Sequence, residues 1–260
     1  MPYTKTTWTE STGITPERLN NLETQYDKAM DEAVTEAVQE IQYYVSPTGS
    51  DSNAGTSAAP FKTIQKAVNM AYKAIAGRVR IDIAAGTYTG DIDIENMMCP
   101  KLFLYGNDET DTIINGGINI KNAQHVQISD LQVRNEFYGI VADNGLRRLQ
   151  VNSVIINNAG IGISAREVEM VTVSSSEIDA NAEGISCDTV GTLSVSSTTF
   201  SGMSTGVISI SGGTFACTSG LIGSLGTVPV HRVSGSILVK GSSTITGGAD
   251  TKSNGGQIFE

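Results

Sequence analysis

The strongest constraint on the fold is an internal repeat of roughly 22 residues in the second half of the chain. Its first clear copy consists of Val126, Ile128, Leu131 and Val133. The same apolar positions return at Leu149, Val151, Val154 and Ile156, then at Val171, Val173, Ser176 and Ile178, then at Leu193, Val195, Thr198 and Phe200, and then at Phe215, Cys217, Gly220 and Ile222. The pattern fades at Ile237 and Val239.

The short runs inside each repeat alternate apolar and polar residues, which is typical of β-strands and not of helices. A second apolar pair follows a glycine in each repeat, for example Ile118 and Ile120 after Gly117. Leucine-rich repeats have a similar period, but their LxxLxLxxN consensus is missing. We therefore expect an all-β fold, a single-stranded parallel β-helix over residues 79–260 with a divergent C-terminal end. Ile156 is expected to point into its interior.

Residues 42–78 differ from the repeat and are expected to form a cap. A short strand and a turn-rich loop precede a helix that we expect from Pro60 to Ala76, because its apolar residues recur at helical spacing. The open end of a solenoid must be covered, since it exposes apolar side chains and unpaired backbone. This helix is the predicted cover.

Residues 15–41 are expected to form a second helix, with Thr15 as its cap and Pro16 at its first position. Its apolar seam is narrow and needs other helices to cover it, which predicts a trimerising coiled coil. A single amphipathic helix lying on its own domain is the alternative. The residues expected to make the oligomer contacts are Leu19, Leu22, Tyr26, Ala29 and Ala33.

Charge limits the partners of the chain. The 17 Lys and Arg residues against 27 Asp and Glu residues give a net charge of −10, and both nucleic acid and anionic membranes require a basic surface. No stretch approaches the ~20 consecutive apolar residues of a membrane span. The first residues are polar and lack the basic-then-apolar order of a secretory signal. We expect neither a nucleic acid nor a membrane partner.

Several short motifs resemble known proteins. Tyr43–Pro47, Gly49–Thr56, Pro60–Ile64 and Ala85–Tyr88 resemble the opening of pectate-lyase-like right-handed parallel β-helix proteins. Segments Thr6–Glu10 and Arg18–Glu23, with the ending Ser253–Phe259, are similar to structural proteins of phages and prophages of Gram-positive bacteria. This resemblance implies a tail spike, tail fibre or neck appendage, with residues 1–14 as the attachment segment.

The phage resemblance also implies partners and a location. It predicts a homotrimer that is assembled in the host cytoplasm and carried in the virion, where other virion proteins bind its N-terminus. Host cell-wall polysaccharide is a further expected partner. The pectate-lyase-like family also contains lyases and hydrolases, so a polysaccharide lyase or hydrolase is the alternative function.

The known catalytic signatures of that family are missing, which favours a structural role over an enzymatic one. Asn-Thr-Asp, Asp-Asp and Gly-His-Gly elements are absent, as is Arg-x-Pro-x-x-Arg. The weak catalytic candidates are Asp143 and Asp188, carboxylates about two repeats apart. Their offsets from the following strand place them on opposite faces of a strand, so we expect no cleavage of pectin, teichoic acid or capsular polysaccharide.

Binding residues are the remaining candidates. One edge of the stack is predicted to bind sugar, because it carries both basic side chains and aromatic rings. The candidates are Phe137, Tyr138, Arg147 and Arg166. The alternative is that this edge, which has mixed charge, is simply a solvent-exposed surface. No cofactor is expected. Calcium is a weak alternative at the acidic loop Asp108, Glu109 and Asp111, and at Asp51-x-Asn53-x-Gly55, which lacks the Glu that would complete a calcium loop.

Overall fold

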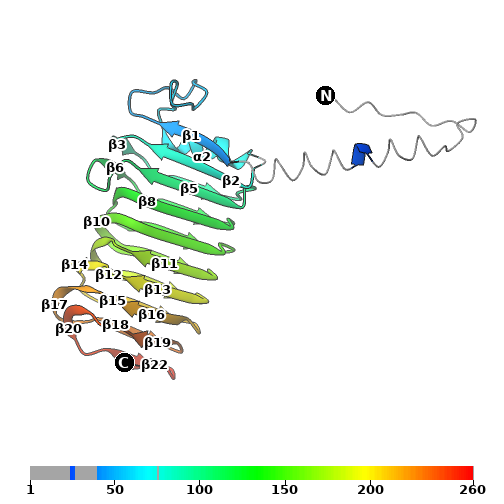
Figure 1. Ribbon diagram of the computed structural model, residues 1–260. Helices are drawn as coiled ribbons and strands as arrows, with labels where there is room; N and C mark the ends of the chain where they lie inside the picture. Colours follow the sequence, from blue (N-terminus) through cyan, green and yellow to red (C-terminus); the bar gives the residue numbers. More distant parts are fainter. Residues whose placement is uncertain (1–23, 27–39, 75, 260) are drawn as a thin grey trace, which may run out of the picture.

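The computed structural model describes residues 24–26, 40–74 and 76–259. These residues form a parallel β-solenoid of about 8 turns, in which the chain passes from the first rung to the last along one axis (Figure 1). Each turn of the solenoid, here called a rung, contributes one strand to each of three faces. All the strand pairings between rungs are parallel.

Face A is the longest stack and lies toward the viewer in Figure 1. It contains β1 (Glu40–Val45), β2 (Arg78–Ile83), β5 (Lys101–Gly106), the first parts of β8 (His125–Arg134) and β10 (Arg148–Arg166), β11 (Met170–Ser174), β13 (Thr192–Ser196), β16 (Phe215–Ser219), β19 (Ile237–Lys240) and β22 (Gln257–Phe259).

Faces B and C complete each rung. Face B contains β3 (Gly86–Thr89), β6 (Thr112–Asn115), later parts of β8 and β10, the start of β12 (Glu177–Asp188), β14 (Thr199–Ser201), β17 (Ile222–Pro229) and β20 (Thr244–Gly248). Face C contains β4 (Ile92–Glu95), β7 (Ile118–Lys121), β9 (Tyr138–Asp143), the ends of β10 and β12, β15 (Gly206–Ser211), β18 (His231–Ser234) and β21 (Thr251–Ser253).

The interior is a column of aliphatic side chains, one layer per rung. Val126, Leu149, Val171 and Leu193 stack in register on face A and are all buried. Ile156 has 0% exposure, which confirms its predicted inward position. Burying a side chain of this size is worth about 1.5–3 kcal/mol, so the repeated layers stabilise the narrow core.

Left-handed residues mark the sharp bends between faces. Asn96, Asn122 and Asn144 follow successive strands of face C and have φ values of 54°, 50° and 40°. Asparagine tolerates this backbone conformation better than most residues. The Asn122 amide Nδ2 donates to Asn96 Oδ1 at 2.9 Å, so the bends of neighbouring rungs are also linked through their side chains.

The predicted register is wrong in the last rungs. Leu193 pairs with Ala216 and not with Phe215, because the bend between β14 and β15 has one residue more than the matching bend of the preceding rung: Asp179 pairs with Ser201, but Glu183 pairs with Gly206. Ala216 is therefore buried, whereas Phe215 is 43% exposed. The side chains of Cys217, Ile222, Ile237 and Val239 shift outward for the same reason.

One helix, α2 (Ile64–Tyr72), occupies the first rung between β1 and β2. It begins later than the predicted Pro60, because the Thr63 side chain accepts from the Lys66 amide and fixes the start of the helix. Ile64, Ala67, Val68 and Ala71 are buried against the solenoid, where α2 contacts β1, β2 and β4. The helix thus takes the place of the missing strands of faces B and C in this rung.

The predicted oligomer contacts fall almost wholly outside the described residues. Leu19, Leu22, Ala29 and Ala33 lie there, while Tyr26 belongs to a helical turn at residues 24–26 and is 65% exposed. Among the residues that the structure describes, no helix is long and apolar enough to cross a membrane.

Candidate functional site

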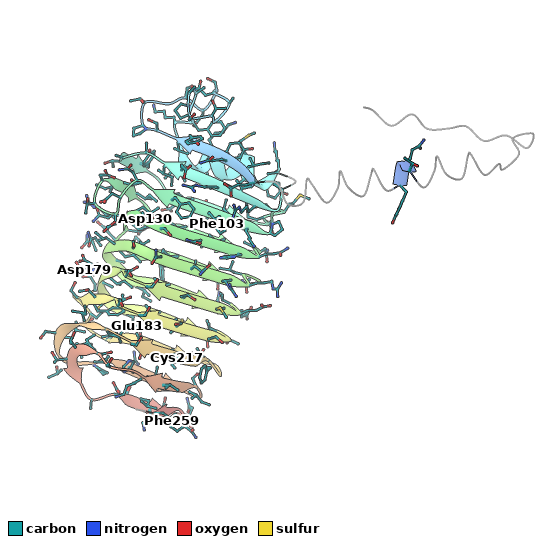
Figure 2. All side chains as sticks on the ribbon, viewed as in Figure 1. Phe103, Asp130, Asp179, Glu183, Cys217 and Phe259 are labelled. Carbon is teal, nitrogen blue, oxygen red and sulfur yellow. The ribbon has the colours of Figure 1, made fainter. Side chains whose placement is uncertain are left out.

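A cluster of rings and guanidinium groups covers the outside of the first rungs of face A. We call it the aromatic patch and define it as Arg78, Arg80, Phe103, Tyr105 and His125. These residues alternate with the buried ones along β2, β5 and β8, so strand periodicity points them all outward. Figure 2 labels Phe103 on this face.

The rings of the patch contact one another and the two arginines. Phe103 and His125 meet edge to face with centroids 5.6 Å apart, and Phe103 lies 6.0 Å from Tyr105. The Arg80 guanidinium carbon lies 4.7 Å from the Tyr105 centroid, and that of Arg78 lies 6.0 Å from Phe103. Such cation–π contacts hold the rings in place.

The charges of the two arginines are partly satisfied. Arg80 Nε lies 2.7 Å from Asp82 Oδ1, and Arg78 forms an ion pair with Glu40. The hydrogen bond and the charge of Asp82 raise the pKa of Arg80, although burial acts in the opposite direction. The ion pairs therefore hold both arginine side chains along the rungs, beside the rings.

Polar side chains continue the stack below the rings. His125 Nε2 lies 2.6 Å from Gln150 Oε1, and Gln127 Nε2 donates to Ser129 Oγ at 3.1 Å. Burial lowers the pKa of His125, as do the charges of Arg148 and Lys101, while the Gln150 hydrogen bond raises it. Flat rings beside amide and hydroxyl groups can pack on a sugar ring and bind its hydroxyls.

The sequence-predicted carboxylates belong to a different site. Asp143 and Asp188 both pair in register with Arg166 on face C, one rung on each side of it. They lie on the same outward face, so the predicted opposite orientation is wrong. The prediction counted the residues from each aspartate to the next strand of face A. The bend between face C and face A varies in length from rung to rung, so this count does not preserve the register.

Arg166 fills the space between these two carboxylates. Its Nε and Nη2 donate to the two oxygens of Asp143 at 3.0 and 2.9 Å, and Ser211 Oγ donates to Asp188 at 2.8 Å. The hydrogen bond and charge of Asp143 raise the pKa of Arg166. Glu95 and Lys121 extend the same column with an ion pair of 3.6 Å. The column is a ladder of alternating charge that links rungs, not an open carboxylate pair.

The predicted sugar-binding residues do not come together. Phe137 is 74% exposed in the bend before face C, and Tyr138 begins β9. Arg147 lies in the bend between β9 and β10, where it pairs with Glu169 at 3.2 Å, and Arg166 ends the strand of face C in the next rung. Phe137 instead lines a hollow of about 610 Å³ with Asn115, Arg134, Asn157 and Asn158.

The acidic residues considered for calcium have other contacts. Asp51 accepts hydrogen bonds from the backbone amides of Lys62 and Thr63, so it fixes the chain at the start of α2. Asp108 accepts from Thr110, and Asp111 accepts from Asn107. Over the described ranges, no group of three or more His, Cys, Asp or Glu residues is arranged to hold a metal ion.

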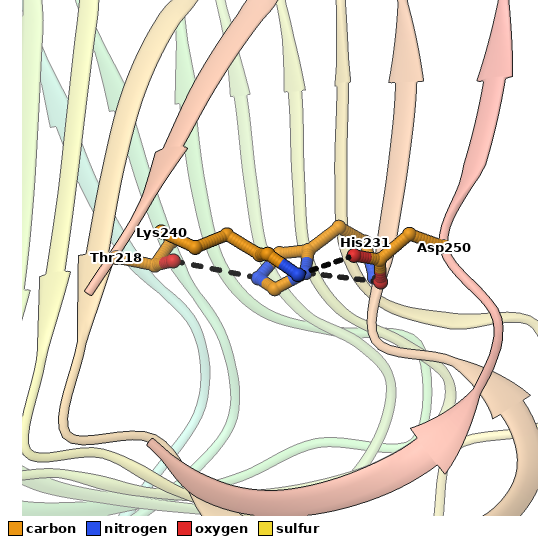
Figure 3. A network of polar contacts seen from close by, with 4 residues as sticks. All are labelled: Thr218, His231, Lys240 and Asp250. Carbon is orange, nitrogen blue, oxygen red and sulfur yellow. Dashed lines mark hydrogen bonds and ion pairs between the residues drawn. The ribbon is translucent and has the colours of Figure 1, made fainter. Parts of the chain in front are cut away.

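A polar network that the sequence did not predict crosses the interior near the C-terminal end (Figure 3). His231 occupies an inward position on face C, where Ile208 stands one rung earlier. Its Nδ1 lies 3.1 Å from Asp250 Oδ1, and its Nε2 lies 3.4 Å from Thr218 Oγ1. Lys240 Nζ donates to Asp250 Oδ2 at 3.2 Å. These four side chains line a hollow of about 610 Å³.

Electrostatics of the network favour an ionised Asp250. Burial raises the pKa of this carboxyl, but the charge of His231 and hydrogen bonds from Lys240 and His231 outweigh it and leave the pKa below its ordinary value. Thr218, His231 and Asp250 stand in the order hydroxyl, imidazole, carboxylate, which is the order that activates a hydroxyl nucleophile.

Sequence reasoning missed both groups for identifiable reasons. The alternation Lys101, Phe103, Tyr105 was visible in the sequence, but the repeat is clear only from Val126 onward, so the outward direction of Phe103 was not predicted. The pair His231 and Asp250 is 19 residues apart, which is shorter than the repeat. Only the short last rungs bring these two side chains together.

Comparison with known proteins supports the fold and leaves the family open. No family model matches the chain. The uncharacterized protein YwoF from Bacillus subtilis (strain 168) is 35% identical over 83 residues, which cover 32% of this chain and only 17% of that relative's length.

Two solved structures share the architecture. A crystal structure of Escherichia coli YbhC matches 78% of this chain and 71% of its own, at 15% identity and a TM-score of 0.59. The pectin methylesterase PemA from Erwinia chrysanthemi matches 79% of this chain and 80% of its own, at 14% identity and a TM-score of 0.50. The fold of this chain is therefore a pectate-lyase-like parallel β-helix.

Proposed function

We propose that the chain is a glycan-binding β-helix of a virion appendage such as a tail spike, tail fibre or neck appendage. The observation that carries the glycan-binding part is the aromatic patch, where Phe103 and Tyr105 are held outward beside hydrogen-bonding side chains. A pyranose ring packs on aromatic faces, and its hydroxyls bind neighbouring amides. The long, regular face A suits an extended polymer better than a small molecule.

The virion part of the proposal rests on the N-terminal sequence. The resemblance of Thr6–Glu10 and Arg18–Glu23 to phage and prophage proteins supports it, as does the apolar seam of residues 15–41. In this proposal, residues 1–14 attach to other virion proteins and the seam forms a homotrimer. The β-helix then acts as a shaft that presents face A to host polysaccharide.

Binding of the purified full chain to an array of neutral and acidic bacterial surface polysaccharides tests the proposal. We expect at least one polysaccharide to bind, and the double variant Phe103→Ala, Tyr105→Ala to lose about tenfold in affinity or more. Phe137→Ala is the matched control, because its ring is exposed elsewhere and should leave binding unchanged. Equal binding by the double variant and the wild type would refute the assignment to face A.

A second candidate function is a polysaccharide hydrolase or lyase. The run of contacts from Thr218 through His231 to Asp250 favours the hydrolase, because it could activate the Thr218 hydroxyl beside the hollow. One of the structural neighbours is a pectin methylesterase, which acts on a polysaccharide. The binding proposal predicts no release of reducing ends, unsaturated sugars or acyl groups by the purified chain. Release that His231→Ala abolishes and Lys121→Gln, on face C, leaves intact would establish the enzyme.

A further inference from the structure

Face A carries basic side chains at one position of three successive rungs, Lys101, His125 and Arg148. Lys101 and Arg148 each pair in register with His125, one rung above and one below it. Neighbouring strands lie about 4.8 Å apart, so Lys101 and Arg148 stand roughly 10 Å apart with His125 between them. Lys101 and Arg148 are exposed at the start of their strands, and His125 between them is half-buried.

The positive charges of Lys101 and Arg148 are available to an external partner. Two acids lie on the outside of face A, in the rungs before Lys101. Glu40 forms an ion pair with Arg78, and Asp82 forms one with Arg80. Within the part of the chain that the structure describes, neither Lys101 nor Arg148 forms an ion pair. Their charges act together on His125, whose pKa is lowered first by burial and then by both of them.

This arrangement is unusual for so acidic a chain. The net charge is −10, and the charged column on face C alternates in sign, as in the ion pairs of Lys121 with Glu95 and of Arg166 with Asp143. Lys101 and Arg148 carry like charges two rungs apart on the same column, and these charges repel each other. A bound anion offsets that repulsion, which makes the column a favourable site for negative charge.

We propose that Lys101 and Arg148, on either side of His125 in this column, bind the anionic groups of a linear acidic polysaccharide. The polymer lies along the solenoid axis, with its carboxylates or phosphates on the column and its sugar rings over Phe103. His125 contacts Phe103 edge to face, so the charged column and the ring surface are contiguous. This inference rests on the glycan-binding function proposed above and names the chemical class of the ligand.

Nucleic acid is the competing polyanion, and three features disfavour it. Only three rungs carry the column, which is short for a long polyanion. The acids Asp108, Glu109 and Asp130 also lie close together where β8 bends from face A to face B, and their charges repel a polyanion. The overall negative charge also repels a long, uniformly charged backbone. A polysaccharide also carries hydroxyl groups, which the amides of Gln127 and Gln150 beside the column can bind.

Titration of the full-length protein with four polymers tests the inference. The probes are polygalacturonate, poly(glycerol phosphate), neutral dextran and single-stranded poly(dT), each at low and high salt. We expect polygalacturonate or poly(glycerol phosphate) to bind, with affinity falling at least tenfold at high salt and tenfold in the double variant Lys101→Gln, Arg148→Gln. Lys121→Gln, which removes one paired charge from face C, is the matched control and should bind as the wild type.

The other outcomes separate the two claims. Dextran binding as tightly as the acidic polymers, without salt dependence, would overturn the anionic class while leaving glycan binding on face A intact. Binding of poly(dT) as tightly as the best acidic polysaccharide would overturn the inference in favour of a general polyanion site. Failure of all four probes, together with failure on the polysaccharide array, would overturn the proposed function itself.

Discussion

The guanidinium of Arg166 binds both carboxylate oxygens of Asp143 across one rung of face C, at 3.0 and 2.9 Å. This contact links the strands of neighbouring rungs and occupies both oxygens of the carboxylate. Exposed ion pairs contribute little to stability, and the Arg166 side chain is 56% exposed.

We therefore expect Asp143→Ala and Arg166→Gln to leave the melting temperature within about 2 °C of the wild type. Glycan binding should also be unchanged, since face C lies apart from the aromatic patch. Thermal melts followed by circular dichroism and the polysaccharide array provide the measurements. A loss of binding in either variant would place the functional site on face C.

Ile156 should be intolerant of charge. Its side chain has 0% exposure between neighbouring rungs, and Ile156→Asp would bury a carboxylate with no partner, at a cost of roughly 3 kcal/mol or more. We expect insoluble protein or a strongly lowered melting temperature. Ile155→Asp is the control, because this neighbour points outward and is half-buried. Equal melting temperatures for Ile156→Asp and the wild type would contradict the strand register.

The interior network predicts a specific acid sensitivity. The pKa of Asp250 is lower in the folded chain than its ordinary value of 3.8. A carboxyl of this kind stabilises the fold above its unfolded pKa, and the contribution is lost as the pH falls through the folded pKa.

The variant Asp250→Asn should therefore be less stable than the wild type at pH 7, and the difference should shrink below about pH 4. Urea denaturation at a series of pH values from 7 to 3 measures it. Glu177→Gln, an exposed acid on face B, is the control and should follow the wild type. A constant difference across the whole range would show that Asp250 does not act through its charge.

The sequence predicted the fold wherever each repeat kept its length. From Val126 to Phe200 the apolar positions point inward as expected, because strands pair one rung apart and a side-chain period of two fixes the face. One extra residue in the bend between Ser201 and Gly206 reverses this for Phe215. A single-residue change in a turn is invisible to a search for apolar periodicity.

The candidate site was less predictable than the fold. The aromatic patch depends on lateral neighbours such as Phe103 and His125, which come from different rungs and are 22 residues apart. Sequence analysis placed ring-bearing residues by their position along the chain and selected Phe137 instead. Contacts between side chains of neighbouring rungs depend on the exact strand register, and the repeat alone gives that register only approximately.

The seam of residues 15–41 leads to a prediction about assembly. We expect the full-length protein to be a trimer, because the narrow apolar stripe of Leu19, Leu22 and Ala29 needs partner helices. Light scattering at micromolar concentration gives the mass, and removal of residues 1–39 should yield a monomer that keeps the solenoid. A monomeric mass for the intact chain would refute the coiled coil.

The most direct test of the account is a crystal structure of the protein with a bound oligosaccharide, prepared from whichever polysaccharide binds on the array. We predict sugar rings over Phe103 and Tyr105 on face A, with the chain of sugars running across β5, β8 and β10. Sugar bound instead in the hollow beside Thr218 and His231, with face A empty, would contradict the account and favour the enzyme.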